Sequence, residues 1–231
     1  MKEWLAYAIV WVVLKLTGAL PRRLARGLAV GVAQTLFALT PKLRKIAEFN
    51  LKLAFPQWTD VQRVATVRGM VRSLGWMAAE FAMTPRYTRK NIEDVIVLDG
   101  QENFLEGRRR GQGVLFLTAH MGAWELSSLA HALYGFPLHY MARPLDNAHL
   151  DALINRYRGL SGNTPIFKND SARAMLKILK DAGTIGILAD QNTLREEGVF
   201  VDFFGVLACT TTGIARVALH TGAAVVPGYA V

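Results

Sequence analysis

From Gly113 onward, short runs rich in apolar and β-branched residues alternate with helical patterns of ten to fourteen residues. This alternation constrains the fold most, because a strand, a helix and a second strand form the repeating unit of a parallel sheet. A Ser, Thr or Asn suited to capping opens several of the helical patterns. We therefore predict an α/β fold, with a mainly parallel sheet flanked by helices. The expected strands are 114–118, 137–142, 164–168, 184–189 and 224–231, and the expected helices are 124–133, 147–160, 171–182 and 211–221.

Polar side chains follow three of these predicted strands. His120 comes after the first strand, Arg143 after the second, and the run 190–192 (Asp-Gln-Asn) after the fourth. The carboxyl ends of parallel strands meet at one edge of a sheet, and α/β proteins bind their ligands beyond that edge. We expect the functional residues of this chain to lie there.

His120 and Glu125 stand on either side of Gly122, directly after the first predicted strand. Five positions along a regular helix turn by about 500°, which leaves two side chains about 140° apart. The pair can therefore meet only if His120 lies in a loop, Gly122 turns the chain and Glu125 begins the next helix. In that arrangement Glu125 orients the imidazole, and His120 acts as a general base on a substrate hydroxyl. A structural pair at the end of a buried strand is an equally open interpretation.

Other kinds of chemistry have little support in the sequence. Without a G-x-S-x-G elbow, no serine nucleophile has a recognisable setting, so the base is expected to act on the hydroxyl directly. The spacing is not H-E-x-x-H and Cys209 is the single cysteine, so we expect no metal and no cofactor. No zinc-finger, RNP or basic-zipper pattern indicates a nucleic-acid partner. Cys209 is interpreted as a small apolar filler, and four histidines as structural: His131, His139, His149 and His220.

The N-terminal half carries all the excess positive charge. Residues 1–110 hold 18 of the 27 lysines and arginines but only 9 of the 18 acidic residues, in a chain of net charge +9. Two apolar segments with basic edges, 4–20 and 24–39, indicate a membrane surface. The first spans about 26 Å as a helix against a hydrocarbon core of about 30 Å, so we expect it to dip into one leaflet. A buried helical hairpin of a soluble core is the alternative.

Two regions follow from these patterns. We predict a helical, basic, membrane-associated region over 1–110, with a further helix at 60–83 that ends near Pro85, and an α/β core over 111–231. Arg108, Arg109 and Arg110 precede the core and are interpreted as a solvated cluster. The chain stops in the apolar run AVVPGYAV without a polar tail, so we expect that a C-terminal continuation is missing.

Several blocks, in order along the chain, resemble one family. H-M-G-A-W-E at 120–125 resembles the H-x4-[DE] motif of the lysophospholipid acyltransferase superfamily. Three further blocks, at 143–147, 186–191 and 203–210, are similar to the R-P-x-x-N, G-x-x-x-D-Q and F-F-G-x-x-x-x-T blocks of its lipid A lauroyl/myristoyl acyltransferase branch. The N-terminal apolar helix and LRKIAEFNLKLAFP resemble that branch as well. The family usually has Asn where this chain has Ala123.

The resemblance implies transfer of a fatty acyl chain from acyl-carrier protein or acyl-CoA. The acceptor is expected to be a hydroxyl of an anionic glycolipid such as a lipid A precursor, at the cytoplasmic face of the bacterial inner membrane. It implies that His120 deprotonates this hydroxyl and that Glu125 orients His120. The hydroxyl then attacks the thioester without an acyl-enzyme.

The remaining blocks imply substrate contacts. Arg143 is expected to bind a phosphate or polarise the acyl carbonyl, unless it forms an ion pair with Asp146 or Asp190. Asp190 and Gln191 are expected to shape the pocket floor or to hold Arg143. Phe203 and Phe204 are expected to form a hydrophobic wall and turn that lines an acyl tunnel. Two other functions stay open: acylation of a lysophospholipid or a phosphoinositide mannoside, and lipid binding without catalysis.

Overall fold

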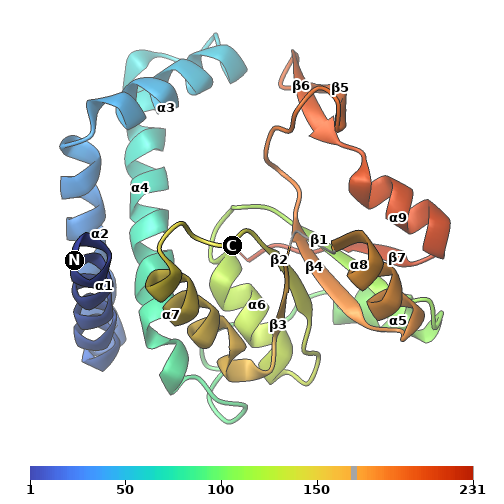
Figure 1. The fold of residues 1–231 in the computed structure, drawn as a ribbon. Coiled ribbons are helices and arrows are strands. Elements are labelled where there is room, and N and C mark those ends of the chain that lie inside the picture. Colours follow the sequence, from blue (N-terminus) through green and yellow to red (C-terminus); the bar gives the residue numbers. More distant parts are fainter. Residues whose placement is uncertain (168–170, 231) are drawn as a thin grey trace.

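The computed structural model describes residues 1–167 and 171–230, and it contains a five-stranded sheet and a separate two-stranded sheet (Figure 1). The strand order of the larger sheet is β3-β2-β4-β1-β7, and each neighbouring pair is parallel. The carboxyl ends of its strands therefore share one edge. The predicted α/β class with a mainly parallel sheet is confirmed. The five strands are β1 (Val114–Thr118), β2 (His139–Ala142), β3 (Thr164–Phe167), β4 (Thr184–Leu188) and β7 (Ala224–Pro227).

Helices pack against both faces of this sheet because side chains alternate along each strand. On β1, Leu115 is fully buried and packs with Met175 and Leu179 on one face. The ring of Phe116 meets Phe104 and His131 on the other face. The flanking helices are α5 (Gln101–Arg109), α6 (Trp124–Leu133), α7 (Ala148–Arg158), α8 (Ser171–Lys180) and α9 (Gly213–Thr221).

The N-terminal region is helical, as predicted, and α4 forms its long central member. A capping box between Thr59 and Gln62 starts α4, and a short 3-10 turn around Pro85 follows its last residue. Gly75 lets α2 approach closely, because a Cβ at this position would lie 2.7 Å from the Cα of Val30. The four helices are α1 (Lys2–Ala19), α2 (Arg22–Ala38), α3 (Pro41–Ala54) and α4 (Asp60–Met83).

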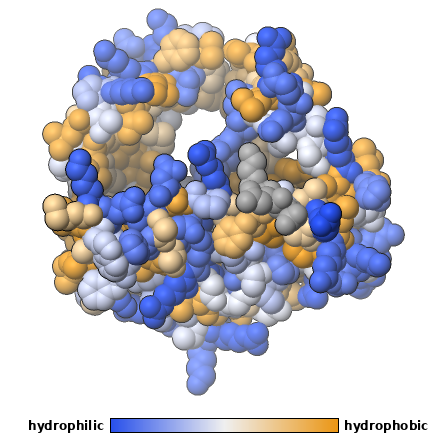
Figure 2. All heavy atoms as spheres, viewed as in Figure 1, coloured by the Kyte–Doolittle hydropathy of each residue, from blue (hydrophilic) through white to orange (hydrophobic). Residues whose placement is uncertain are grey.

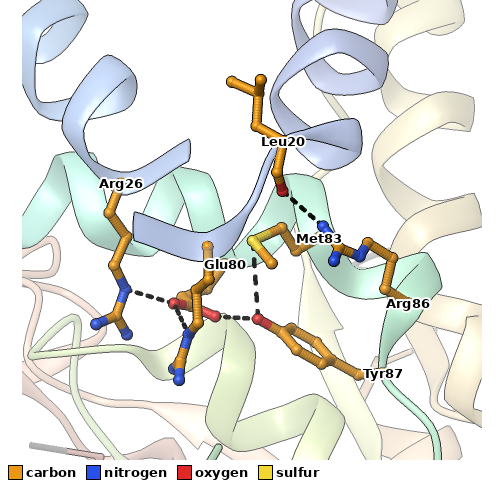
Figure 3. A network of polar contacts seen from close by, with 7 residues as sticks. Leu20, Arg26, Glu80, Met83, Arg86 and Tyr87 are labelled. Atoms are coloured by element: carbon orange, nitrogen blue, oxygen red, sulfur yellow. Dashed lines mark hydrogen bonds and ion pairs between the residues drawn. The ribbon is translucent and has the colours of Figure 1, made fainter. Parts of the chain in front are cut away.

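A buried carboxylate fastens α2 to α4 (Figure 3). Glu80 is 2% exposed, and its Oε1 accepts hydrogen bonds from the Nε atoms of Arg22 at 2.9 Å and Arg26 at 2.6 Å. The hydroxyl of Tyr87 donates to Oε2 of the same carboxylate. Burial acts to raise the pKa of Glu80, but these hydrogen bonds outweigh it and hold the pKa below its ordinary value. Glu80 is therefore an ionised and fully engaged group that fixes the helical region in place.

The outer sides of the N-terminal helices are unusually apolar. Trp4, Leu16, Leu24 and Leu36 are each at least 59% exposed. Among the described helices, none is both long and apolar enough to cross a bilayer alone; α2 and α3 reach that threshold jointly, with a bend of 91° between them. Membrane association of this region stays a prediction.

Four elements escaped sequence analysis. The helices α3 and α5 were not predicted as separate elements, and β5 (Gly198–Phe203) and β6 (Val206–Thr211) form an antiparallel hairpin where only a wall and turn were expected. The run V-F-V-D-F lacks a clear apolar and polar alternation, because both faces of β5 are exposed. The predicted helix 211–221 begins two residues late, since Thr211 belongs to β6. Lys168 and Val231, at predicted strand ends, lie outside the described residues.

Candidate active site

His120 lies in the loop that follows β1, at the carboxyl edge of the sheet. Gly122 turns the chain there with a φ of 61°, a left-handed conformation that suits glycine, and α6 begins at Trp124. The sharp turn predicted at Gly122 is confirmed. The ring of Trp124 packs against the imidazole in an edge contact, with 5.4 Å between the ring centroids. The side chain of His120 remains 39% exposed, so a substrate can reach it.

The partner of His120 is Asp190. Nδ1 of His120 lies 2.9 Å from Oδ1 of Asp190, and the main-chain N–H of His120 donates to Oδ2 at 2.9 Å. The parallel register explains this pairing: Thr118 of β1 lies opposite Leu188 of β4, so the residues two positions further on emerge side by side. One carboxylate thus holds both the ring and the backbone of the histidine.

This pairing defines the chemistry of the imidazole. An ionised carboxylate only accepts hydrogen bonds, so the hydrogen shared with Asp190 belongs to Nδ1 of His120. The lone pair of Nε2 is then free to accept a proton. Partial burial acts to raise the pKa of Asp190, but the hydrogen bonds from the ring and main chain of His120 lower it below its ordinary value. Asp190 therefore stays ionised and favours a protonated imidazole during a proton transfer.

Glu125 does not occupy the place expected for it. Its carboxylate forms a two-point ion pair with Arg158, whose Nε lies 3.0 Å from Oε2 and whose Nη2 donates to Oε1. The expected pairing of His120 with Glu125 is therefore wrong, although Glu125 does lie in the first turn of α6 as predicted. The geometric reason is that His120 reaches sideways to the neighbouring strand, whereas Glu125 reaches the end of α7. Glu125 is only 13% exposed.

Arg158 is a residue that sequence analysis missed. Burial acts to lower its pKa, but the hydrogen bond and charge of Glu125 outweigh this and raise it. The guanidinium also lies over the ring of Tyr140, 5.6 Å from its centroid. Arg158 lies near the end of the predicted helix 147–160, beside Arg156 in the same turn. An arginine near a helix end gives no signal of a partner 33 positions away.

The other two predicted polar residues lie at the same edge. The order β2-β4-β1 places Arg143, Gln191 and His120 beyond three adjacent strands, and all three side chains are exposed. The expectation that Asp190 holds Arg143 is wrong, because Asp190 holds His120. Among residues 1–167 and 171–230, no ion pair involves Arg143.

The aromatic residues of the F-F-G block lie at the tip of the β5–β6 hairpin. Phe203 is 60% exposed and Phe204 is 52% exposed, and the ring of Phe204 contacts Phe55 with 5.1 Å between centroids. Cys209 is buried in the middle of β6, where its main-chain N–H donates to the side chain of Asn192 at 2.9 Å. The run 190–192 therefore serves two purposes: Asp190 holds His120, and Asn192 anchors the hairpin.

In the described part of the chain, no group of three or more His, Cys, Asp or Glu side chains is arranged to hold a metal ion. The chemistry available at this edge is thus that of His120 with Asp190, with an arginine and an amide near them. Such a set fits proton transfer to and from a hydroxyl nucleophile.

Comparison with known proteins agrees with the order of the blocks. Residues 1–230 match the family model described as bacterial lipid A biosynthesis acyltransferase. A Haemophilus influenzae lipid A biosynthesis acyltransferase is 33% identical over 172 residues, which cover 73% of this chain and 53% of that protein. The Escherichia coli lipid A biosynthesis lauroyltransferase is 26% identical over 225 residues, covering 97% of this chain and 72% of the relative.

The Escherichia coli lipid A biosynthesis myristoyltransferase is 27% identical over 184 residues, covering 80% of this chain and 57% of the relative. The chain thus spans little more than half the length of two of these three relatives. The family match nevertheless extends over nearly every residue, from the apolar N-terminal helix through the His120 loop to β7. The chain belongs to the bacterial lipid A biosynthesis acyltransferase family.

Proposed function

We propose that this protein is an O-acyltransferase that moves a fatty acyl chain from a thioester donor to a hydroxyl of a lipid A precursor or a related anionic glycolipid. The donor is acyl-carrier protein or acyl-CoA, and the reaction takes place at the cytoplasmic face of the bacterial inner membrane. The names of its relatives support the reaction class. The observation that carries the proposal is the His120–Asp190 pair, with an exposed imidazole at the carboxyl edge of the sheet.

The reaction needs one base and one acid, and His120 serves as both. Its Nε2 takes the proton of the acceptor hydroxyl while the oxygen forms a bond to the thioester carbonyl carbon. The tetrahedral intermediate then collapses, the carbon–sulfur bond breaks, and the thiolate leaves with the proton from Nε2. Asp190 keeps Nδ1 protonated throughout and stabilises the imidazolium that forms between the two steps.

The remaining residues divide between substrate contact and support. Arg143 and Gln191, exposed beside the pair, bind the phosphate of the acceptor or the oxygen of the acyl carbonyl. Glu125 acts through Arg158, since their ion pair fixes the first turn of α6 and with it the loop that carries His120. Phe203 and Phe204 offer apolar surface to the acyl chain.

Mass spectrometry of a lipid A precursor, incubated with the protein and a set of acyl-carrier-protein and acyl-CoA donors, tests the proposal. We expect a product heavier by one acyl group. The H120A variant is expected to form it about 10²–10⁴-fold more slowly, the usual worth of a positioned general base. H220A is the matched control, because His220 is exposed on α9 and belongs to no part of the proposed site.

Three outcomes oppose the proposal. Transfer by H120A at the parental rate removes His120 from the mechanism. Acylation of a lysophospholipid or a phosphoinositide mannoside in place of the lipid A precursor changes the acceptor. If no donor and acceptor react while the lipid still binds to the parent protein and to H120A alike, the protein binds lipid without catalysis.

A further inference from the structure

The helix α3 carries an apolar stripe that nothing within the described chain covers. Leu43, Ile46, Phe49 and Leu53 are 51%, 46%, 65% and 46% exposed. At 100° per residue these four positions fall within an arc of about 120° on a helix. No residue of α3 is buried. An apolar arc of this kind, left open along a whole helix, is typical of a contact surface.

The same helix is strongly basic. Lys42, Arg44, Lys45 and Lys52 lie on it, against the single acidic residue Glu48. Two shallow hollows of about 430 and 370 Å³ run along its side and are lined in part by Lys42, Lys45, Phe49 and Lys52. On the same wheel Lys45 and Lys52 lie about 40° and 60° beyond Phe49, at one edge of the apolar arc, and Lys42 lies within the arc at the start of the helix. An apolar arc with lysines at its edge is the pattern of a helix that lies in the surface of an anionic bilayer.

The tip of the β5–β6 hairpin carries exposed apolar side chains on both faces. Phe203, Phe204 and Leu207 are 60%, 52% and 67% exposed, and Phe200, in the middle of β5 opposite Cys209, is 50% exposed. Phe204 and Gly205 form the tight turn, both with positive φ, at 56° and 76°. Asn or Asp is usual at the first of these positions, since a bulky side chain there is strained. A phenylalanine held exposed at a strained position indicates that the tip presents it to an apolar environment.

These two apolar surfaces lie at one end of the molecule. The ring of Phe204 meets Phe55, at the end of α3, with 5.1 Å between centroids, and Phe55 stacks on Trp58 at 4.0 Å. Figure 1 shows α3 lying across the ends of α2 and α4 while the hairpin rises to the same level. Figure 2 shows hydrophobic side chains along this end and an open space between the N-terminal helices and the hairpin. The segment that follows β4 carries Asp190 and Asn192 and leads into the hairpin at Gly198, so this end is also the carboxyl edge that carries His120.

We propose that α3 and the hairpin tip form one platform that rests on an anionic lipid bilayer. The lysines select a negatively charged surface, and the aromatic residues suit the level of the headgroups. A bilayer meets both surfaces at once, although they come from segments about 150 residues apart. The carboxyl edge then faces the membrane, so a lipid hydroxyl reaches His120 without leaving the bilayer. This inference concerns the orientation of the protein and goes beyond the proposed reaction.

Probes placed at single cysteines test the contact itself. An environment-sensitive fluorophore is attached at F49C, at L207C and, as a control, at L219C, because Leu219 is 87% exposed on α9, away from the platform. Cys209 is buried, so the parent protein treated with the same reagent gives the blank. With vesicles of phosphatidylcholine and phosphatidylglycerol, emission at positions 49 and 207 is expected to shift to the blue, and emission at 219 to stay unchanged. If the probes at positions 49 and 207 still report an aqueous environment while the protein is bound to vesicles, the proposal is overturned.

A second experiment separates the effect of the α3 lysines on membrane binding from any effect on the acyl-transfer reaction itself. Replacing Lys42, Lys45 and Lys52 by Gln is expected to weaken binding to anionic vesicles about fivefold per lysine, from roughly 1 kcal/mol each, and to leave binding to neutral vesicles unchanged. Acyl transfer by this triple variant is expected to fall when the acceptor is in anionic vesicles and to match the parent when it is in detergent micelles. An equal fall of acyl transfer in anionic vesicles and in detergent micelles would overturn the proposed platform. If the parent transfers no acyl chain at all, the proposed function fails, while the fluorescence test still decides the platform.

Discussion

Two carboxylates in different regions of this molecule accept hydrogen bonds from basic side chains, and the two carboxylates differ in how deeply they are buried. Glu80 in the helical region is 2% exposed and accepts hydrogen bonds from two arginines and a tyrosine. Asp190 at the sheet edge is 34% exposed, and its partner His120 is 39% exposed and uses only Nδ1 of its ring in the contact with Asp190. The comparison teaches that a buried and fully bonded carboxylate holds elements together, whereas a half-exposed pair that keeps a proton-accepting atom open is suited to chemistry.

The exposure of the Glu125 side chain lies between those of Glu80 and Asp190. Its side chain is 13% exposed, and both of its oxygens are bonded to Arg158. By the same criterion it resembles Glu80 more than Asp190, because its bonding capacity is directed at one arginine. We therefore assign Glu125 a positioning role beside the reactive pair.

The largest stability effect is expected at Glu80. E80A removes the carboxylate that joins α2 to α4 and leaves the buried hydroxyl of Tyr87 without its acceptor. We expect a loss of about 3 kcal/mol in the free energy of unfolding, the low end for breaking a buried ion pair, since both arginines are about one-third exposed and can reach water. Chemical denaturation measures it. E48A is the matched control, because the exposed Arg44–Glu48 pair is worth less than about 0.5 kcal/mol.

The pH dependence of stability sharpens the same contrast. The pKa of Glu80 is lowered from 4.5 in the folded protein, so its contribution is fully present above about pH 4.5 and is lost as the pH falls through the lowered value. Unfolding measured between pH 7 and pH 3 is expected to show a steeper loss of stability in the parent than in E80Q. Parallel curves for the two proteins would show that Glu80 is not held ionised by its partners.

The smallest effect is expected at the start of α6. Ala123 occupies the N-cap and makes no side-chain capping hydrogen bond, so the helix next to the reactive loop begins without a cap. A123N is expected to raise the free energy of unfolding by about 1 kcal/mol or less. Thermal unfolding at pH 7 measures the gain. No change, or a loss, would mean that an amide at this position cannot reach the free N–H groups of α6.

The sequence predicted most of the sheet and α4 because their patterns are local. Strand β1 and helices α4 and α6 have the predicted bounds, since each is an apolar run or a helical pattern with a clear start and end. The hairpin was missed because both faces of β5 are exposed and carry apolar residues, so no alternation marks it as a strand. Local pattern predicts an element only where one face is buried.

Prediction of the candidate site from the sequence has the same limit. The loop position of His120, the turn at Gly122 and the position of Asp190 after the fourth predicted strand of the sheet were all predicted. The pairing itself was not, because it depends on which strands are adjacent, and β1 lies next to β4 rather than next to β2. A residue 70 positions away is the partner of His120, while the near one, Glu125, turns to α7.

The central claim is that Asp190, and not Glu125, keeps His120 ready to accept a proton. The most direct test compares kcat for D190N and E125Q, at a temperature where both are folded. In D190N the amide can donate to Nδ1 and so favours the wrong imidazole tautomer; we expect kcat to fall at least about 10²-fold. E125Q is expected to keep a kcat close to that of the parent and to lose mainly stability. A large fall of kcat in E125Q together with a parental kcat in D190N would contradict the account.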